Sequence, residues 1–195
     1  MPNERCQEAI ELIDEANSED PNTETWEGVE YPRELLYGRR MTAWLERLQP
    51  EPSDLQYIAA RGQHIRRWTV PRNRYPMTRV GYLQWRTGLY DFHAKQVGKI
   101  MAQAGYEPDA IEQVRRILRK RGLKKDPDVQ LIEDVACLVF IENYFLDFAK
   151  EYEEEKVLSV IRKTWKKMSP HAQQAALDIA LPERAAGLIR KALEG

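Results

Sequence analysis

Two of the three histidines in this sequence stand where apolar spacing places them on helix faces that point inward. His93 follows Trp85 and Leu89 at steps of four residues, so its imidazole is expected on the apolar side of a helix. His64 lies in a stripe with Trp68 at the edge of another apolar face. A lone histidine at such a position is most simply a hydrogen-bonded core residue. Two of them in neighbouring helices suggest a site.

A carboxylate is expected in the apolar middle of a later helix. Asp134 shares its helix face with Cys137, Leu138 and Ile141. The preceding residue, Glu133, is also expected near apolar side chains, although less clearly. A buried carboxylate is costly unless it meets a cation, a metal or several hydrogen-bond donors. Imidazoles and carboxylates on facing helices are how helical bundles build metal sites. None of these residues lies at a local ligand spacing such as HExxH.

The segment from residue 60 to residue 95 is strongly basic. There is no acidic residue between Asp54 and Asp91, and aromatic residues alternate with the arginines. The arginines are Arg61, Arg66, Arg67, Arg72, Arg74, Arg79 and Arg86. Planar guanidinium groups bind phosphate or carboxylate through paired hydrogen bonds. The segment is therefore a candidate anion-binding surface in a chain whose formal net charge is only -1.

The elements that must position these groups are helices. Apolar residues recur with a period near 3.6 along the chain, and no period-2 run of β-branched residues persists. At 195 residues, the chain suits one domain. We predict an all-α single-domain bundle (residues 1–195) of about seven to nine helices. The expected helices cover residues 3–16, 33–48, 54–68, 78–105, 108–122, 126–152 and 153–169, with two short ones beginning near residues 170 and 182.

Composition narrows the class of protein. The longest apolar run, VACLVFI, is far shorter than the roughly 20 residues that a membrane-spanning helix requires. The N-terminal residues lack the layout of a secretory signal. The two cysteines, Cys6 and Cys137, have no metal-type spacing and are expected to be buried thiols. These features predict a cytoplasmic protein that does not act on membranes.

Several longer motifs carry a family resemblance. ELLYGRRMTAWL, YIAARGQHIRRW, YPMTRVGYLQWR, FHAKQVGKIM, LIEDVACLVF and IRKTWKKMS follow one another along the chain. With these motifs the sequence resembles bacterial domain-of-unknown-function family 4202, whose members are often called glutamyl-tRNA synthetases. The resemblance covers nearly the whole chain and implies no particular activity. Nothing in the sequence looks like a synthetase, because the strand-helix alternation of a nucleotide-binding sheet is absent.

A more distant resemblance is to the HD-domain superfamily of helical, metal-dependent phosphohydrolases. It implies that Gln63 and His64 stand where that superfamily has its His-Asp pair, that Asp134 matches the final aspartate, and that Tyr37 falls in place of the first histidine. A rearranged metal site then consists of His64, His93 and Asp134, with Glu34 as a fourth ligand. The cofactor implied is a divalent metal ion, either Mn, Fe or Zn. It would polarise a phosphoryl oxygen and activate a bound water.

The resemblance and the arginines together predict a hydrolase, or a former hydrolase, that acts on a small phosphorylated or other anionic molecule. The residues expected to bind this substrate are Arg61, Arg67, Arg72, Arg79, Arg86, Tyr37, Gln63, Glu133, Trp85, Lys163 and Lys166, with Lys167 adding to the positive field. The catalytic residues themselves are left unassigned.

Two alternatives stay open. One is a helical interaction or scaffold protein whose arginines pair internally with carboxylates, with no catalysis. The other is an RNA- or single-stranded nucleic-acid-binding protein, in which aromatic residues stack on bases and arginines follow the phosphates. Against the latter, 30 basic residues are balanced by 31 acidic ones. A homo-oligomer is compatible with each of these hypotheses.

Overall fold

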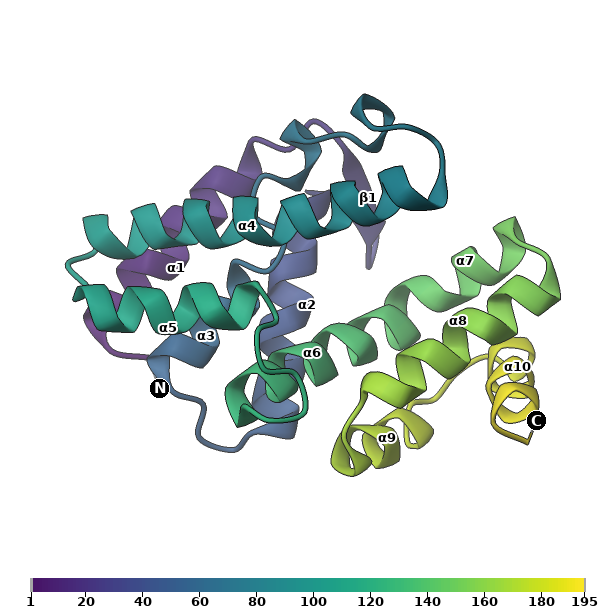
Figure 1. Ribbon diagram of the computed structural model, residues 1–195. Helices are drawn as coiled ribbons and strands as arrows, with labels where there is room; N and C mark the ends of the chain where they lie inside the picture. The colour runs from purple at the N-terminus through teal and green to yellow at the C-terminus, as the bar shows by residue number, and fades with distance from the viewer. Residues whose placement is uncertain (1, 195) are drawn as a thin grey trace. The chain divides into compact units, whose positions relative to one another are not determined.

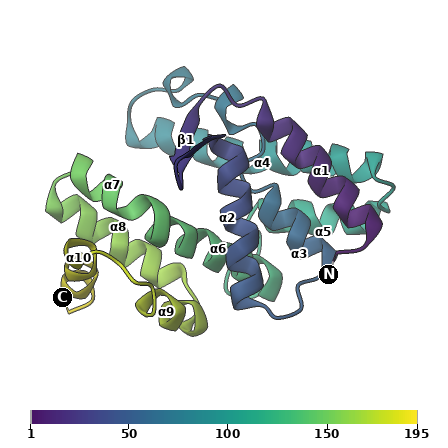
Figure 2. The ribbon, with the colours of Figure 1, turned by 180° about the vertical axis from the view of Figure 1, so that it is seen from behind.

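The computed structural model describes residues 2–194 and shows an all-α protein with one small hairpin (Figures 1 and 2). The hairpin consists of β1 (Thr23–Trp26) and β2 (Val29–Pro32). The helices are α1 (Glu4–Ser18), α2 (Arg33–Leu48), α3 (Asp54–Arg61), α4 (Arg79–Gln103), α5 (Pro108–Leu118), α6 (Pro127–Val139), α7 (Phe145–Glu151), α8 (Glu154–Lys167), α9 (Pro170–Leu177) and α10 (Glu183–Glu194). The predicted all-α class is confirmed. Among the helices described, none has both the length and the apolar character needed to cross a membrane.

The chain divides into two compact units, one ending at Ile132 and the other beginning at Glu133, inside α6. The expectation of a single domain stays a prediction.

Helices α1 to α5 build most of the first unit. Helix α3 packs against α1, α2 and α5, while α4 lies along α5 and α1 (Figure 1). The core between them consists of fully buried aliphatic side chains, among them Ile13, Leu36, Met41, Leu45, Ile58, Met101 and Ile117. Burying one side chain of this size stabilises the fold by roughly 1.5–3 kcal/mol. This core holds the helices that carry the candidate site.

Side-chain caps fix where two of these helices begin. At the start of α3, the Ser53 hydroxyl accepts a hydrogen bond from the Gln56 amide, and the Gln56 side chain accepts one from the Ser53 amide. At the start of α4, the Thr78 hydroxyl accepts from the Gly81 amide. The caps therefore set the register of the helices that precede His64 and carry His93.

The segment between α1 and α2, which lies outside every helix predicted from the sequence, is a hairpin. Trp26 pairs with Val29 in antiparallel register, and Glu27 and Gly28 form the turn between them. Both turn residues have positive φ, 51° and 78°, as a two-residue type I′ turn requires. Each strand has only four residues, too few to give a period-2 signal in the sequence.

Helix α3 ends at Arg61, before its predicted end at Trp68. A turn follows, and then a short 3₁₀ helix over Arg67–Thr69. Within the turn, Arg66 has a φ of 51°, in the left-handed region, and its amide donates to Asn17 Oδ1 at 3.0 Å. The prediction of one continuous helix was wrong because a tertiary hydrogen bond from α1 stabilises the break.

The second unit contains the end of α6 together with α7 to α10. A π-helical segment, Phe140–Tyr144, connects α6 to α7, so the long helix predicted here is continuous in direction but not in hydrogen-bond pattern. Helix α8 packs on α10 and α7. The aliphatic and aromatic side chains buried in this unit include Leu138, Phe145, Val157, Ile161 and Ile189.

Packing of the 67–78 loop on α4 makes two glycines of this helix respond differently to substitution. A Cβ at Gly81 would lie 2.1 Å from the Pro76 carbonyl oxygen, whereas a Cβ at Gly88 would have the Tyr75 hydroxyl as its nearest neighbour, at 3.6 Å. We expect Gly81→Ala to lower the free energy of unfolding by about 1–3 kcal/mol through the forced shift. Gly88→Ala should raise it by about 0.5–1 kcal/mol through helix propensity. Urea unfolding measures both, and equal effects would contradict this packing.

Candidate functional site

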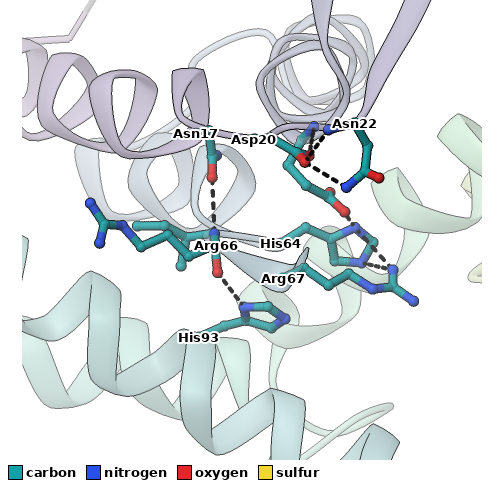
Figure 3. A network of polar contacts seen from close by, with 9 residues as sticks. Asn17, Asp20, Asn22, His64, Arg66, Arg67 and His93 are labelled. Carbon is teal, nitrogen blue, oxygen red and sulfur yellow. Dashed lines mark hydrogen bonds and ion pairs between the residues drawn. The ribbon is translucent and has the colours of Figure 1, made fainter. Parts of the chain in front are cut away.

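A network of buried polar side chains in the first unit connects α1, α2, the turn after α3 and α4 (Figure 3). Asn17, Asp20, Glu34, Gln63 and His93 each expose 8% or less of their surface. Polar and ionisable groups are costly at such depth unless they are hydrogen-bonded or paired. The partners that they find define the chemistry of the site.

The His93 imidazole is neutral and its protonation pattern is fixed by the backbone. Its Nδ1 lies 3.0 Å from the carbonyl oxygen of Ile65. Because a carbonyl oxygen only accepts, Nδ1 carries the proton. Burial, and then the neighbouring His64, lower the pKa of His93 to about 3. At neutral pH its Nε2 therefore carries a lone pair and no proton.

The His64 imidazole follows the same pattern with a carboxylate in place of the carbonyl. Its Nδ1 lies 3.2 Å from Glu34 Oε2, and Nη1 of Arg67 lies 3.2 Å from Nε2 and 3.3 Å from Nδ1. Because a guanidinium only donates, both contacts are satisfied when Nδ1–H faces Glu34 and Nε2 accepts from Arg67. Burial, and then the charges of Arg67 and Lys120, hold the pKa of His64 well below its usual range. The side chain nevertheless keeps 23% of its surface exposed.

Glu34 is held in place by a second carboxylate. Asp20 Oδ2 accepts from the Glu34 amide at 3.1 Å, and Asp20 Oδ1 accepts from both the amide and the side chain of Asn22. Burial raises the pKa of Glu34, while the charges of Arg67 and Arg33 act in the opposite direction. The N-terminus of α2 is therefore anchored to the loop that follows α1, and with it the carboxylate that orients His64.

Aromatic rings enclose the imidazole of His64 and the guanidinium of Arg67. The Tyr37 ring stacks on His64 with centroids 3.9 Å apart, and the His93 ring centroid is 5.9 Å from that of His64. The Arg67 guanidinium lies 5.1 Å from the centre of the Trp85 ring. Trp85 is itself fixed by a 2.8 Å hydrogen bond from Nε1 to the Val70 carbonyl. Arg67 thus contacts both His64 and Trp85.

Six of the residues predicted from the sequence come together here: Glu34, Tyr37, His64, Arg67, Trp85 and His93. Gln63, beside His64, is buried, and its Oε1 has no hydrogen-bond partner among residues 2–194. Sequence reasoning missed Asn17, Asp20, Arg33 and Lys120. Asn17 lies near the end of α1 and Asp20 just after it, in an acidic, asparagine-containing stretch whose composition predicts side chains exposed to solvent. No sequence pattern connects Lys120 to His64.

The other arginines of the basic segment, apart from Arg79, have other partners. The Arg61 guanidinium pairs with Asp14 at 2.8 Å and contacts Thr42, so it stabilises the packing of α3 on α1 and α2. Arg72 donates to the carbonyls of Tyr75, Pro76 and Thr78. Arg79 is exposed at the start of α4, and Arg86 donates from Nε to the Tyr90 hydroxyl. Their roles in substrate binding stay predictions.

The remaining predicted residues belong to the second unit. The burial predicted for Asp134 is confirmed, with 4% of its surface exposed, and its Oδ1 accepts from the Ser169 amide at 2.9 Å. Glu133 is equally buried and lies 3.3 Å from the Lys167 ammonium group. Lys163 and Lys166 are exposed on α8. Whether Asp134 joins the histidines at a metal ion stays a prediction.

The side chains of the first unit are of the types that bind a metal ion, but they are not grouped closely enough to hold one. Among residues 2–194, no three His, Cys, Asp or Glu side chains are grouped so as to hold an ion. His64 and His93 nevertheless present unprotonated Nε2 atoms, with each Nδ1–H held by an oxygen. That is the usual state of a metal-bound histidine. Nη1 of Arg67 lies almost equally far from both ring nitrogens of His64, 3.3 Å from Nδ1 and 3.2 Å from Nε2, so a cation stands against the imidazole that would bind an ion.

Comparison with known proteins places the chain in a family. The model of the family described as Domain of unknown function (DUF4202) matches residues 7–189, and the chain belongs to this family. No curated protein and no solved structure matches the chain. The resemblance to the HD-domain superfamily stays a prediction.

The buried neutral histidines predict a stability that falls with acidity. The folded pKa of His93, about 3, lies below the ordinary value of 6.5, so the unfolded chain binds the extra proton between these values. Stability from this residue is therefore complete above pH 6.5 and is lost as the pH falls toward 3. Between pH 8 and pH 5 the loss should be about 2 kcal/mol for His93 alone.

The measurement is urea unfolding of metal-free protein across this pH range, compared with His93→Asn. The asparagine amide keeps a donor near the Ile65 carbonyl but does not titrate. The variant should be less stable than the wild type near neutral pH and should lose less stability on acidification. Parallel losses in the two proteins would show that His93 is not held neutral.

Proposed function

We propose that the first unit of this DUF4202 protein is a metal-assisted hydrolase domain that acts on a small phosphorylated or otherwise anionic molecule. The observation that supports this most strongly is the shared state of His64 and His93. Burial lowers the pKa of each imidazole, and each has an oxygen beside Nδ1: the Ile65 carbonyl at 3.0 Å from His93 and the Glu34 carboxylate at 3.2 Å from His64. This arrangement leaves Nε2 of each ring as the unprotonated nitrogen, the atom that would bind a metal once Arg67 moves from His64.

In this proposal His64 and His93 bind a divalent ion through Nε2, and Glu34 orients His64 from the opposite side of its ring. Glu34 then acts as a support for the ligand, a different role from the direct ligand expected from the sequence. Two imidazoles suit Zn and Fe, and Mn stays a candidate if oxygen ligands complete the site. When bound, such an ion polarises a phosphoryl oxygen and lowers the pKa of a water that attacks phosphorus.

The positive charges near His64 provide the affinity for an anion. Arg67 contacts His64, and Arg33 and Lys120 are close enough for their charges to lower its pKa as well. A planar guanidinium binds a phosphoryl group through two hydrogen bonds. An arriving anion would draw Arg67 away from His64, and this movement would leave Nε2 open. The guanidinium would then stabilise the negative charge that develops on the anion during the reaction. Tyr37, stacked on the ring, keeps His64 in plane during this change.

A non-catalytic interaction protein is the second candidate, because two arginines of the segment are paired internally. Arg61 contacts Asp14 and Arg66 contacts Glu19. These pairs account for part of the basic segment without a ligand. They leave unexplained why two neutral imidazoles are buried together, which is why hydrolysis is the preferred proposal. The two buried free cysteines, Cys6 and Cys137, are consistent with a cytoplasmic location within the same proposal.

The metal is tested first, on untagged protein reconstituted separately with manganese, iron and zinc. We expect near-stoichiometric metal by plasma mass spectrometry and metal-dependent hydrolysis of phosphate monoesters or nucleotides. His64→Ala and His93→Ala should both lose the metal and the activity. His171→Ala is the matched control, because this third histidine is exposed on α9 of the second unit. Absence of bound metal in the wild type under all three conditions would sink the proposal in favour of the non-catalytic one.

The role of Arg67 is tested by Arg67→Gln, with Arg121→Gln as an exposed arginine control. Loss of one charge-assisted hydrogen bond, worth about 1.5–3 kcal/mol, should raise KM for the anionic substrate about ten- to a hundredfold. Metal content should be retained, since a competing cation is removed. A variant with unchanged KM would show that Arg67 does not bind the substrate.

A further inference from the structure

Two exposed surfaces of the first unit lie outside the site, and they are opposite in charge. The first, called here the basic face, combines the end of the 67–78 loop with the first turns of α4. Its apolar side chains are Met77, Val80 and Leu83, with 79%, 65% and 49% of their surface exposed. Val80 and Leu83 are three residues apart in α4 and therefore share one side of the helix.

The charge on the basic face comes from Arg72, Arg74 and Arg79. Arg72 and Arg74 donate to backbone carbonyls of the loop, which orients their guanidinium groups without neutralising them. None of the three has a carboxylate partner among residues 2–194. The face therefore presents fixed positive charge around exposed aliphatic groups.

The second surface, called here the acidic hairpin, is the turn end of the β1–β2 hairpin. Trp26 and Val29 are 43% and 51% exposed. Glu27 and Glu30 are exposed beside them and have no cationic partner within the described residues. Trp26 and Val29 are a cross-strand pair on one face of the hairpin, while Glu27 stands in the turn and Glu30 lies on the other face of β2. The turn end as a whole therefore combines exposed apolar groups with free carboxylates, opposite in charge to the basic face.

Both surfaces lie at the same end of the first unit in the two views of Figures 1 and 2. We propose that a second copy of the chain covers them: the acidic hairpin of each protomer docks on the basic face of its partner in a two-fold symmetric dimer. A two-fold interface needs two complementary patches on each copy, and each patch is then used once by each protomer. The contact pairs Trp26 and Val29 with the aliphatic side chains of the basic face, and Glu27 and Glu30 with its arginines.

A polyanion fits this end of the molecule less well. The most exposed apolar side chains of the basic face are aliphatic and do not stack on bases, its exposed Tyr82 ring lies against Trp85, and Trp68, Tyr75 and Trp85 are half-buried. Glu27 and Glu30 at the same end would repel a nucleic acid or an anionic lipid surface. A second copy of the chain carries both an acidic and a basic surface and can therefore complement both surfaces of the first.

A charge-swap experiment tests the dimer by sedimentation velocity across a range of protein concentrations. The wild type should dimerise in a concentration-dependent way. Arg74→Glu/Arg79→Glu gives a chain with two acidic surfaces, and Glu27→Lys/Glu30→Lys gives one with two basic surfaces. Each should raise the dimer dissociation constant about a hundredfold or more, because like charges then face each other. An equimolar mixture of the two should form a heterodimer, since every contact is again complementary.

Matched controls change the same charges elsewhere. They are Arg121→Glu/Lys124→Glu after α5 and Glu8→Lys/Glu11→Lys on α1, all exposed positions. Circular dichroism confirms folding of each variant, and Met77→Ser/Leu83→Ser, which removes exposed apolar groups without altering charge, should also weaken the dimer. The proposal is overturned by a wild type that stays monomeric at the highest concentration, by dimers that survive both charge reversals, or by a mixture that stays monomeric.

Discussion

The hydrogen bond from the Arg66 amide to Asn17 is the contact on which the candidate site depends. It holds Arg66 in the left-handed region, a conformation that is strained for a long side chain and persists only when the surroundings enforce it. The chain therefore leaves the axis of α3 after Arg61. The break points the Ile65 carbonyl at His93 and places His64 against Glu34. A continuous helix would use the Ile65 carbonyl within the helix, and His93 would lose its only backbone partner in the network.

Burial is the largest influence on the protonation state of the two histidines. Two imidazoles share one low-dielectric region with the Arg67 cation, so protonating either is doubly unfavourable. Keeping both neutral leaves lone pairs directed away from the oxygens that hold Nδ1. Asp20 anchors the backbone of Glu34, and the Glu34 carboxylate beside Nδ1 fixes which nitrogen of His64 is bare. The proposed binding of a metal ion at Nε2 and of an anion at Arg67 both depend on this arrangement of two neutral imidazoles beside one guanidinium.

The sequence predicts the helices and the inward position of His93 because both follow from a 3.6-residue period. It also identifies Glu34 and His64, through the resemblance and the apolar stripes. It does not predict the turn after α3, because the stabilising partner, Asn17, is distant in the chain and stands in a polar stretch. For the same reason it does not predict that the Arg61 guanidinium packs against Asp14, and the role of Arg61 in binding a substrate stays a prediction.

The most direct test of the account is the protonation state of the two imidazoles, read by two-bond proton–nitrogen NMR on metal-free protein near neutral pH. The account predicts that His64 and His93 are both neutral with the proton on Nδ1, and that zinc shifts the Nε2 resonance of both. A proton on Nε2 of either ring, a charged imidazolium, or a zinc titration that leaves both Nε2 signals unmoved would contradict it.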